Sequence, residues 1–423
     1  MKVIFLQLNI FFAVAAAVFV IFMSSAHAAP IEILDERAAP YYWLRRTADG
    51  NKILLDDAAI KKFNRFILER DNYSADLKNY PRKISAADLT ARINQLTNDV
   101  HADAAPELMA KRNLDALTGD VEIRFAVTVE RANVRILPTP HDGDRYDGLQ
   151  ATALDPAEAV AVLWESSDGA YVFAQARNYF GWIAKDSLAF TDRKTWLNYV
   201  HPKNFLVVTD NKFSLELNGR QVLFQMGAKI PLARTELKDN FWTTRIPVSV
   251  NGTLHEILVE LPSDESLNCG FLDCTANNFI RQSFKFLGDV YGWGGLDNSV
   301  DCSSYVGDVY RSMGLEIPRD ANRQEGAMPI FAVFNNVTRE ERLDIVRRSP
   351  VGALLFKRGH VMLKLGDDDS GTPIIIHAAS SYISGGQKIY VRKILVSDLN
   401  YVGNVNPTID DLTGIAFARD FTK

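Results

Sequence analysis

Hydrophobic positions along the chain change their spacing twice, and each change marks a different kind of structure. In the first part, Ile60, Phe63 and Ile67 recur at helical spacing, and Ser85 is placed to cap a second amphipathic helix. No residue pattern of a catalytic or metal site occurs there. We therefore expect a helical N-terminal domain over residues 29–121.

Short strand patterns separated by Gly, Pro and Asp turns follow in two consecutive groups. We call residues 122–201 the first β module and residues 202–262 the second β module. The expected strands lie at residues 125–137, 159–164, 170–175 and 181–184 of the first, and 205–209, 212–217, 221–225, 244–250 and 255–261 of the second. This strand spacing predicts two small β-barrels.

Residues 263–423, the C-terminal region, have an α+β pattern. A helix is expected over residues 275–287, and a second helix begins at Cys302 and ends near Gly314. Strands are expected at residues 351–356, 360–365, 373–377, 389–396 and 414–418.

The N-terminus has the pattern of a secretory signal peptide. Lys2 precedes an apolar run over residues 3–23, and Ala26-His-Ala28 has the small-x-small spacing of a cleavage site. We expect a signal peptide over residues 1–28, cleaved after Ala28, and a secreted or periplasmic protein with no remaining membrane span. An uncleaved membrane anchor is the alternative, because the run approaches spanning length.

Composition and cysteine content narrow the class of protein. The 423 residues are 47% hydrophobic and 23% charged, which is typical of globular proteins, and the net charge of −5 gives no support for nucleic-acid binding. The chain has three cysteines, Cys269, Cys274 and Cys302. In an oxidising compartment, Cys269 and Cys274 either form a disulfide or stay unpaired, and Cys302 is free in both cases.

Cys302 has the position of an activated nucleophile. Asp301 is a good N-cap, so the thiol falls in the first helical turn, where unpaired N–H groups and the helix dipole stabilise a thiolate. His360 and His377, which are the histidines that follow Cys302, lie on two strands predicted to be adjacent. This order predicts Cys302 as nucleophile, His360 as base and His377 as the group that orients His360. A zinc site made from the same three residues is the alternative.

The connection between the two histidine strands carries Asp367-Asp-Asp-Ser-Gly371. A calcium loop needs alternating ligands and a distal glutamate, which this segment lacks. We therefore expect a solvated hairpin turn.

Five short motifs occur in order within residues 277–419. They are Tyr291-x-Trp-Gly-Gly, Asp301-Cys-Ser, Ile-Pro-Arg319-Asp, Gly-His360-Val and Ile-His377-Ala. Together they resemble the NlpC/P60 family of cell-wall peptidases. The segments 131–138 and 179–183 resemble bacterial SH3-type modules. The resemblance implies a multidomain protein with a helical N-terminal domain, two SH3-like β-barrels and a papain-like NlpC/P60 domain over residues 263–423.

The resemblance also implies an activity, the hydrolysis of the γ-D-glutamyl–diamino acid bond of peptidoglycan stem peptides, without cofactor or metal. Cys302 would form an acyl-enzyme, and the hydroxyl of Tyr291 would hold the oxyanion together with the Cys302 N–H. The residues that match substrate-binding positions are Asp301, Ser303, Arg319 and Asp320. Tyr179 is either a substrate contact from the first SH3 module or a core aromatic beside Gly181-Trp182. Asp320 suits a free L-Ala ammonium, whereas Ser303 and Arg319 suit the D-Glu carboxylate. In relatives of this architecture the first SH3 module restricts cleavage to peptides with a free N-terminal L-Ala.

The chain departs from the family pattern in three places. The loop before Cys302 is one residue shorter, Ser304 replaces the usual glycine, and the segment 367–371 is an extension. Trp293 is expected to pack beneath its loop, while Gly294 and Gly295 suit a tight backbone path. Two other functions remain open, a cysteine amidase or acyltransferase, and a non-catalytic cell-wall-binding protein.

Overall fold

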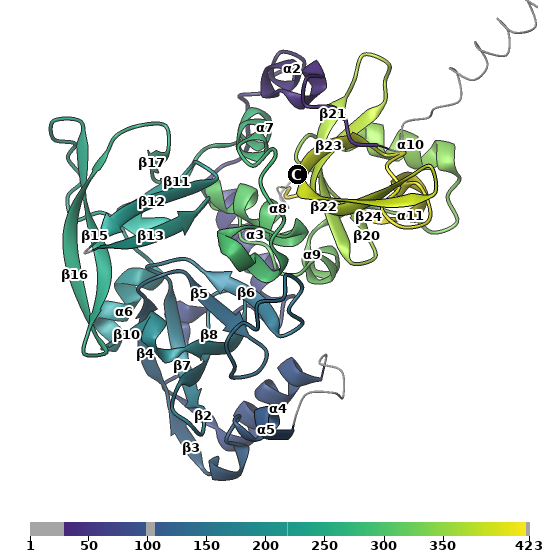
Figure 1. Ribbon diagram of the computed structural model, residues 1–423. Helices are drawn as coiled ribbons and strands as arrows, with labels where there is room; N and C mark the ends of the chain where they lie inside the picture. The colour runs from purple at the N-terminus through teal and green to yellow at the C-terminus, as the bar shows by residue number, and fades with distance from the viewer. Residues whose placement is uncertain (1–28, 99–105, 218, 420–423) are drawn as a thin grey trace, which may run out of the picture.

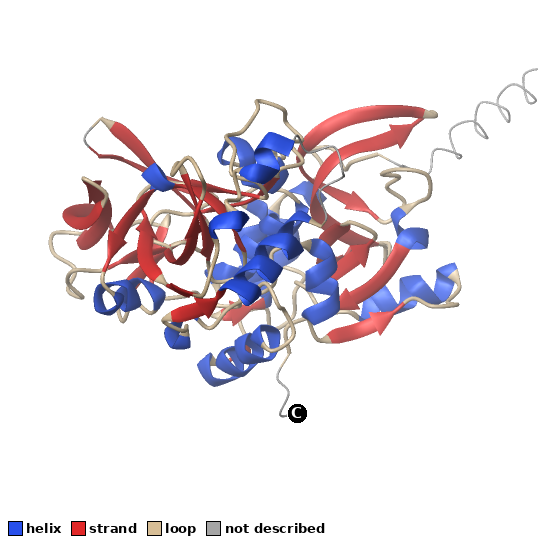
Figure 2. Ribbon diagram, turned by 90° about the horizontal axis from the view of Figure 1, so that it is seen from below, coloured by secondary structure: helices blue, strands red, loops and turns tan. Residues whose placement is uncertain are grey.

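The structure is a computed structural model that describes residues 29–98, 106–217 and 219–419, so the predicted signal peptide lies outside it. Within these ranges no helix has both the length and the apolar character needed to cross a membrane. The two β modules lie on one side of the molecule and the C-terminal sheet lies on the other (Figure 1). Seen from below, helices fill the space between the two strand-rich sides (Figure 2).

The N-terminal region is mixed rather than all-helical, which corrects the sequence prediction. Its elements are η1 (Glu36–Ala38), α2 (Pro40–Leu44), β1 (Ile53–Leu55), α3 (Asp57–Leu68), η2 (Leu77–Asn79), β2 (Lys83–Ser85), α4 (Ala86–Thr97), α5 (Pro106–Ala110), η3 (Leu114–Ala116) and β3 (Asp120–Glu122). Side-chain caps from Asp56 and Ser85 start the two long helices, as Ser85 predicted. The strands β1 and β2 are three residues each, too short to show a periodic pattern.

This region is shared between two hydrophobic cores. Phe63 and Ile67 of α3 are buried together with Phe279 and Tyr305 of the C-terminal region. Further along the chain, Ile93 of α4 is buried among residues of the first β module. The first half of the region therefore completes the C-terminal core, and the second half completes the β core.

The first β module does not form a closed barrel of its own, contrary to expectation. Its elements are β4 (Arg124–Thr128), β5 (Ala132–Arg135), β6 (Gln150–Leu154), β7 (Ala159–Glu165), β8 (Tyr171–Gln175), β9 (Phe180–Ala184), η4 (Lys185–Ser187), β10 (Leu188–Thr191) and α6 (Arg193–Val200). The expected strand over residues 125–137 is broken into β4 and β5, which occupy distant positions in one sheet. That sheet has nine strands in the order β15-β16-β10-β4-β7-β8-β9-β5-β6.

Strands of the second β module are distributed over three sheets. They are β11 (Phe205–Val208), β12 (Lys212–Leu217), β13 (Arg220–Gln225), β14 (Lys229–Pro231), β15 (Phe241–Val250) and β16 (Thr253–Pro262), with β17 (Leu267–Cys269) following. The hairpin β15–β16 joins the sheet of the first module through a parallel contact between β10 and β16. The two modules are thereby fused, so the predicted second barrel is not closed either.

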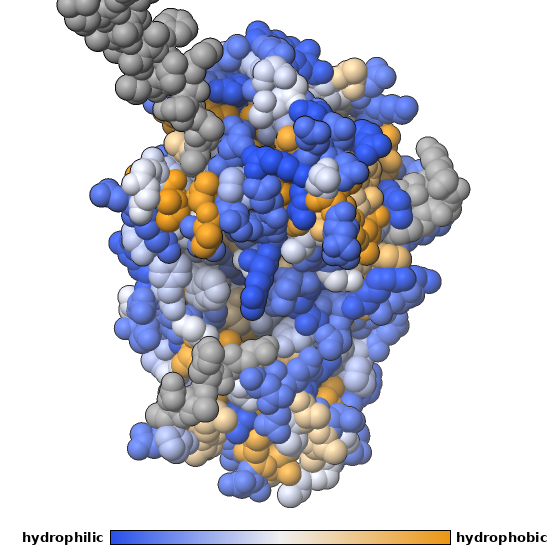
Figure 3. Space-filling view, turned by 90° about the vertical axis from the view of Figure 1, so that its right-hand side faces the viewer, coloured by the Kyte–Doolittle hydropathy of each residue, from blue (hydrophilic) through white to orange (hydrophobic). Residues whose placement is uncertain are grey.

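The C-terminal region is an antiparallel sheet with helices, as predicted. Its elements are β18 (Cys274–Thr275), α7 (Ala276–Phe284), η5 (Trp293–Asn298), α8 (Cys302–Ser312), α9 (Ala321–Ala327), β19 (Ile330–Val333), α10 (Arg339–Arg348), β20 (Leu354–Lys357), β21 (His360–Asp367), β22 (Pro373–Ser384), β23 (Gln387–Asp398), α11 (Thr408–Asp411) and β24 (Leu412–Ala416). Six strands pair in the order β19-β24-β20-β21-β22-β23. The inner face of α8 buries Tyr305, Val306 and Val309 against this sheet. The face of the molecule that lies on the right in Figure 1 is largely hydrophilic, with separate apolar patches (Figure 3).

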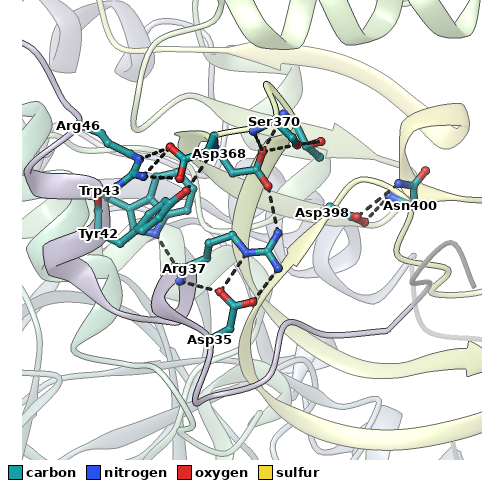
Figure 4. Close-up of polar contacts among 11 residues, drawn as sticks. Asp35, Arg37, Tyr42, Trp43, Arg46, Asp368, Ser370, Asp398 and Asn400 are labelled. Atoms are coloured by element: carbon teal, nitrogen blue, oxygen red, sulfur yellow. Dashed lines mark hydrogen bonds and ion pairs between the residues drawn. The ribbon is translucent and has the colours of Figure 1, made fainter.

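The N-terminal segment contacts the turn between β21 and β22, in which Asp369 and Ser370 remain exposed. Asp368 accepts hydrogen bonds from the backbone of Ser370 and pairs with Arg37 at 3.0 Å, while Arg46 pairs with Asp369 at 2.5 Å (Figure 4). The hairpin turn is as predicted, but Asp368 is largely buried by this contact.

Replacement of Phe63 by alanine tests the shared core. Phe63 is fully buried, and removing a buried aromatic ring costs about 3–5 kcal/mol. We expect Phe63→Ala to lower the free energy of urea unfolding by that amount, while the exposed Lys62→Ala stays within about 0.5 kcal/mol of wild type. If α3 were a dispensable cap, the two variants would have the same stability.

Candidate active site

Cys302 is the first residue of α8, and its cap is complete. The Asp301 side chain accepts from the Ser304 N–H at 2.9 Å, and the Ser304 hydroxyl accepts from the Asp301 N–H at 2.9 Å. Ser304, which departs from the family pattern, therefore closes a capping box. The N–H groups of Val361 and Ser303 also act on the Cys302 thiol, which places the sulfur beside the start of β21.

The two histidines are in contact, as the strand prediction required. His360 Nε2 and His377 Nδ1 are 2.9 Å apart, and His377 Nε2 lies 3.3 Å from the Ser397 hydroxyl. The ring of His377 also meets the Tyr401 ring edge-on at 5.0 Å. Both contacts are hydrogen bonds when each histidine carries its proton on Nε2, and equally when each carries it on Nδ1 and Ser397 donates. In the first arrangement the nitrogen of His360 that is free to accept a proton is Nδ1. Ser397 and Tyr401 were not identified from the sequence.

Burial determines the protonation of this centre. It raises the pKa of the Cys302 thiol to about 12, and the Asp301 carboxylate acts in the same direction. Burial lowers the pKa of His360 to about 3, and Lys357 adds to this shift. Both shifts favour the neutral forms.

Tyr291 lies close to Cys302 and belongs to a group of three aromatic side chains. Burial, Cys302 and Asp301 all raise the pKa of its hydroxyl, so it is a protonated hydrogen-bond donor at neutral pH. Tyr146 of the first β module lies with its ring 6.4 Å from that of Tyr291 and 6.4 Å from that of Trp293. Trp293 is 40% exposed, so the prediction that it packs beneath the loop is wrong. Tyr146 was missed, although a lone aromatic in the polar segment 139–148 is a usable signal.

Asp301, Ser303 and Arg319 bind one another in a buried cluster. Arg319 pairs with Asp301 at 2.7 Å and donates to the Ser303 hydroxyl at 2.9 Å and to the Thr152 hydroxyl at 2.7 Å. Thr152 belongs to β6, so this arginine joins the first β module to the start of α8. Arg319 is only 7% exposed, and four of its five N–H donors have partners in this cluster.

Asp320 follows Arg319 directly, and the charges of both residues act on the hydroxyl of Tyr179. Burial raises the pKa of Asp320 to about 6, although Arg319 opposes the shift. Burial also raises the pKa of the Tyr179 hydroxyl, and the Asp320 carboxylate adds to that shift. Tyr179 itself is 7% exposed and packs on Tyr73.

The three cysteines are unpaired, which decides between the two alternatives for Cys269 and Cys274. Cys269 is exposed, and Cys274 and Cys302 are buried. Burial raises the pKa of Cys274 to about 12. This residue lies in the apolar core with Leu55, where a thiol behaves as a small hydrophobic group.

Gly294 and Gly295 allow the first β module to approach the loop before Cys302. Both have positive φ, +58° and +80°. A Cβ on Gly294 would lie 2.6 Å from Gln150 Cγ, and one on Gly295 would lie 3.1 Å from the Cβ of Ala153. Gln150 also donates to the Gly294 carbonyl at 3.0 Å. The expected tight backbone path is therefore also a packing surface for β6.

A pair of glycine variants separates backbone strain from packing. Gly371 has φ of +77°, and a Cβ added there would meet nothing within 4 Å, so Gly371→Ala should cost only the strain of about 1–2 kcal/mol. Gly294→Ala adds an overpacked contact with Gln150, which costs about 1–3 kcal/mol more. Urea unfolding of both variants measures the difference. Equal losses would contradict the close contact of β6 with this loop.

Comparison with known proteins agrees with the motifs. Residues 137–184 match the SH3 domain of SH3b1 type, and residues 288–396 match the NlpC/P60 family. The chain is similar to an NlpC/P60 endopeptidase from Photobacterium damselae subsp. piscicida, with 18% identity over 89% of this chain and 94% of that chain and a TM-score of 0.66. An NlpC/P60 family protein from Bacillus cereus ATCC 10987 has 18% identity over 70% of this chain and 99% of that chain, with a TM-score of 0.49.

No curated protein sequence matches the chain. The first of the two solved structures shares the multidomain fold of this chain. With the two family matches, it confirms the resemblance drawn from the motifs. Residues 137–184 therefore correspond to an SH3 domain of SH3b1 type, and residues 288–396 correspond to an NlpC/P60 domain.

Proposed function

We propose that this protein is a secreted or periplasmic peptidoglycan hydrolase that cleaves the γ-D-glutamyl–diamino acid bond of stem peptides. The observation that carries the proposal is the line of contacts His360–His377–Ser397 beside a buried cysteine at a helix start. A protein that only binds cell wall has no need of this arrangement. The NlpC/P60 match supports a peptide of the cell wall as substrate.

In the proposed mechanism Nδ1 of His360 takes the thiol proton as Cys302 attacks the γ-carbonyl of D-Glu. His377 and Ser397 hold His360 in the tautomer that leaves Nδ1 free. Collapse of the tetrahedral intermediate breaks the C–N bond, and the imidazolium gives its proton to the leaving amine. Water, deprotonated by the same imidazole, then hydrolyses the thioester and returns Cys302 to the thiol.

The oxyanion would be bound by the Tyr291 hydroxyl and the Cys302 backbone N–H. The raised pKa of Tyr291 keeps this donor protonated while negative charge develops on the carbonyl oxygen. The N–H groups at the first turn of α8 point in the same direction as the helix dipole, which favours an anion there.

The acyl side of the peptide would lie toward the first β module. Asp320 supplies the carboxylate for a free L-Ala ammonium, with Tyr179 beside it as the contact from the SH3 domain. One Nη2 N–H of Arg319 remains for the D-Glu carboxylate, because its other donors bind Asp301, Ser303 and Thr152. We therefore assign Asp301 and Ser303 mainly to holding Arg319.

We also propose the domain limits 29–121, 122–201, 202–262 and 263–423 behind the signal peptide 1–28, with the second β module as a further SH3-like unit. A cysteine amidase or acyltransferase with the same triad would differ only in its products. A zinc site would leave metal in the purified protein, which elemental analysis detects.

Replacement of the nucleophile or the base tests the reaction. We expect Cys302→Ala and His360→Ala each to lower cleavage of L-Ala-γ-D-Glu-diaminopimelate by about 10³-fold or more, because triad members act as a unit. Mass spectrometry identifies the products, and unfolding curves show that both variants fold. The exposed Cys269→Ala should keep full activity. Cleavage by Cys302→Ala at the wild-type rate would contradict the proposal.

The pKa of Asp320, about 6, predicts how binding depends on pH. As the pH falls through this value, Asp320 takes up a proton and loses the negative charge that would bind the ammonium. KM for a peptide with a free L-Ala ammonium should therefore rise about tenfold between pH 7 and pH 5. Asp320→Asn should raise KM at pH 7 and remove this dependence. An N-acetylated peptide, which lacks the ammonium, is the control, and an identical pH profile for it would exclude Asp320 as the ammonium site.

A further inference from the structure

Lys357 places a cation next to the catalytic base. It ends β20 and pairs directly with His360 at the start of β21, across a turn in which Gly359 has φ of +71°. Residues directly opposite in an antiparallel pair project from the same face of the sheet. The side chain of Lys357 therefore lies on the same face as the imidazole of His360.

The ammonium of Lys357 has no hydrogen-bond or ion-pair partner among the described residues. A Cβ on Gly403 would lie 3.0 Å from Nζ, so the group rests against the loop that follows β23. Asp411 is the carboxylate that acts on it, but Asp411 accepts from Asn406 at 2.9 Å and forms no ion pair with Lys357. Partial burial without a partner lowers the pKa of this lysine.

The position of Lys357 assigns it to the leaving-group side of the substrate. In the proposed function the acyl side lies toward the cluster of Arg319, which contacts the first β module. Lys357 approaches Cys302 from the β20–β21 turn and the loop at Gly403 instead. The neighbouring Arg358 is exposed and adds a second positive charge to this turn.

We propose that Lys357 binds a carboxylate of the amine product, and so selects stem peptides whose diamino acid carries a free carboxylate near the scissile bond. This inference rests on the proposed function. The carboxylate is either the side-chain carboxylate of diaminopimelate or its main-chain carboxylate at the end of a tripeptide. If the ligand is the side-chain carboxylate, a diamino acid such as lysine, whose side chain ends in an ammonium alone, would be repelled.

The test compares kcat/KM for matched peptides. L-Ala-γ-D-Glu-diaminopimelate is assayed with both carboxylates free, with the side-chain carboxylate amidated, and with the main-chain carboxylate amidated. Enzymes are wild type, Lys357→Met, Lys357→Arg and the exposed Lys203→Met as a charge-matched control. We expect wild type to prefer the free acid over one of the two amides by about tenfold or more. The amide that loses this rate identifies the carboxylate.

For Lys357→Met, kcat/KM on the free acid should fall at least tenfold, and the preference for the acid over the amide should disappear. Lys357→Arg should keep part of this preference, and Lys203→Met should have the kcat/KM values of wild type. Thermal unfolding and the rate of Cys302 alkylation by iodoacetamide should stay near wild type. If kcat/KM of Lys357→Met fell equally on all three peptides, or if slower alkylation of Cys302 accounted for the fall, Lys357 would act on the thiol. Either result would overturn this inference and leave the proposed function standing. If wild type cleaves none of the peptides, the proposed function fails first, and the inference with it.

Discussion

The carboxylate of Asp301 is the point on which the site depends. It caps α8, accepts from the Gly294 N–H at 3.0 Å and pairs with Arg319 at 2.7 Å, all at 7% exposure. A buried ion pair of this kind is stable only when further hydrogen bonds satisfy both charges. Here they do, and the pKa of Asp301 is lowered although its burial alone would raise it. The charge of Asp301 thereby holds three parts of the site in place. They are α8, the loop at Gly294 and Arg319, which reaches the first β module.

The same charge has a chemical effect on its neighbour. A negative group adjacent to Cys302 raises the thiol pKa, whereas the helix dipole and the N–H of Val361 lower it. Burial of the thiol raises its pKa more than the carboxylate does, so the neutral thiol is favoured. In the proposed mechanism the thiolate therefore forms by proton transfer to His360 during the reaction. The contacts from His360 to His377 and Ser397 fit that role, because a general base must be held in one orientation.

Sequence patterns predicted the parts of the structure that depend on local periodicity or on adjacent strands. The helices α3, α4 and α8 and the contact between His360 and His377 are of this kind. Features set by distant segments were not predictable. The barrels were expected to close because strand spacing does not show that β16 pairs with β10. Likewise, nothing local in Arg319 shows that Thr152 accepts from it, or that Arg37 and Arg46 find the turn at Asp368.

The division of residues 29–98 between two cores has a consequence for the order of folding. The apolar side of α3 has its partners, Phe279 and Tyr305, more than two hundred positions later in the chain. Contacts across so long a separation form late, since closing the intervening chain costs entropy before they stabilise anything. A chain emerging from its N-terminus cannot bury α3 until the C-terminal region is present. The core around Cys302 is therefore complete only after the C-terminal region has emerged, and a partly emerged molecule would lack it.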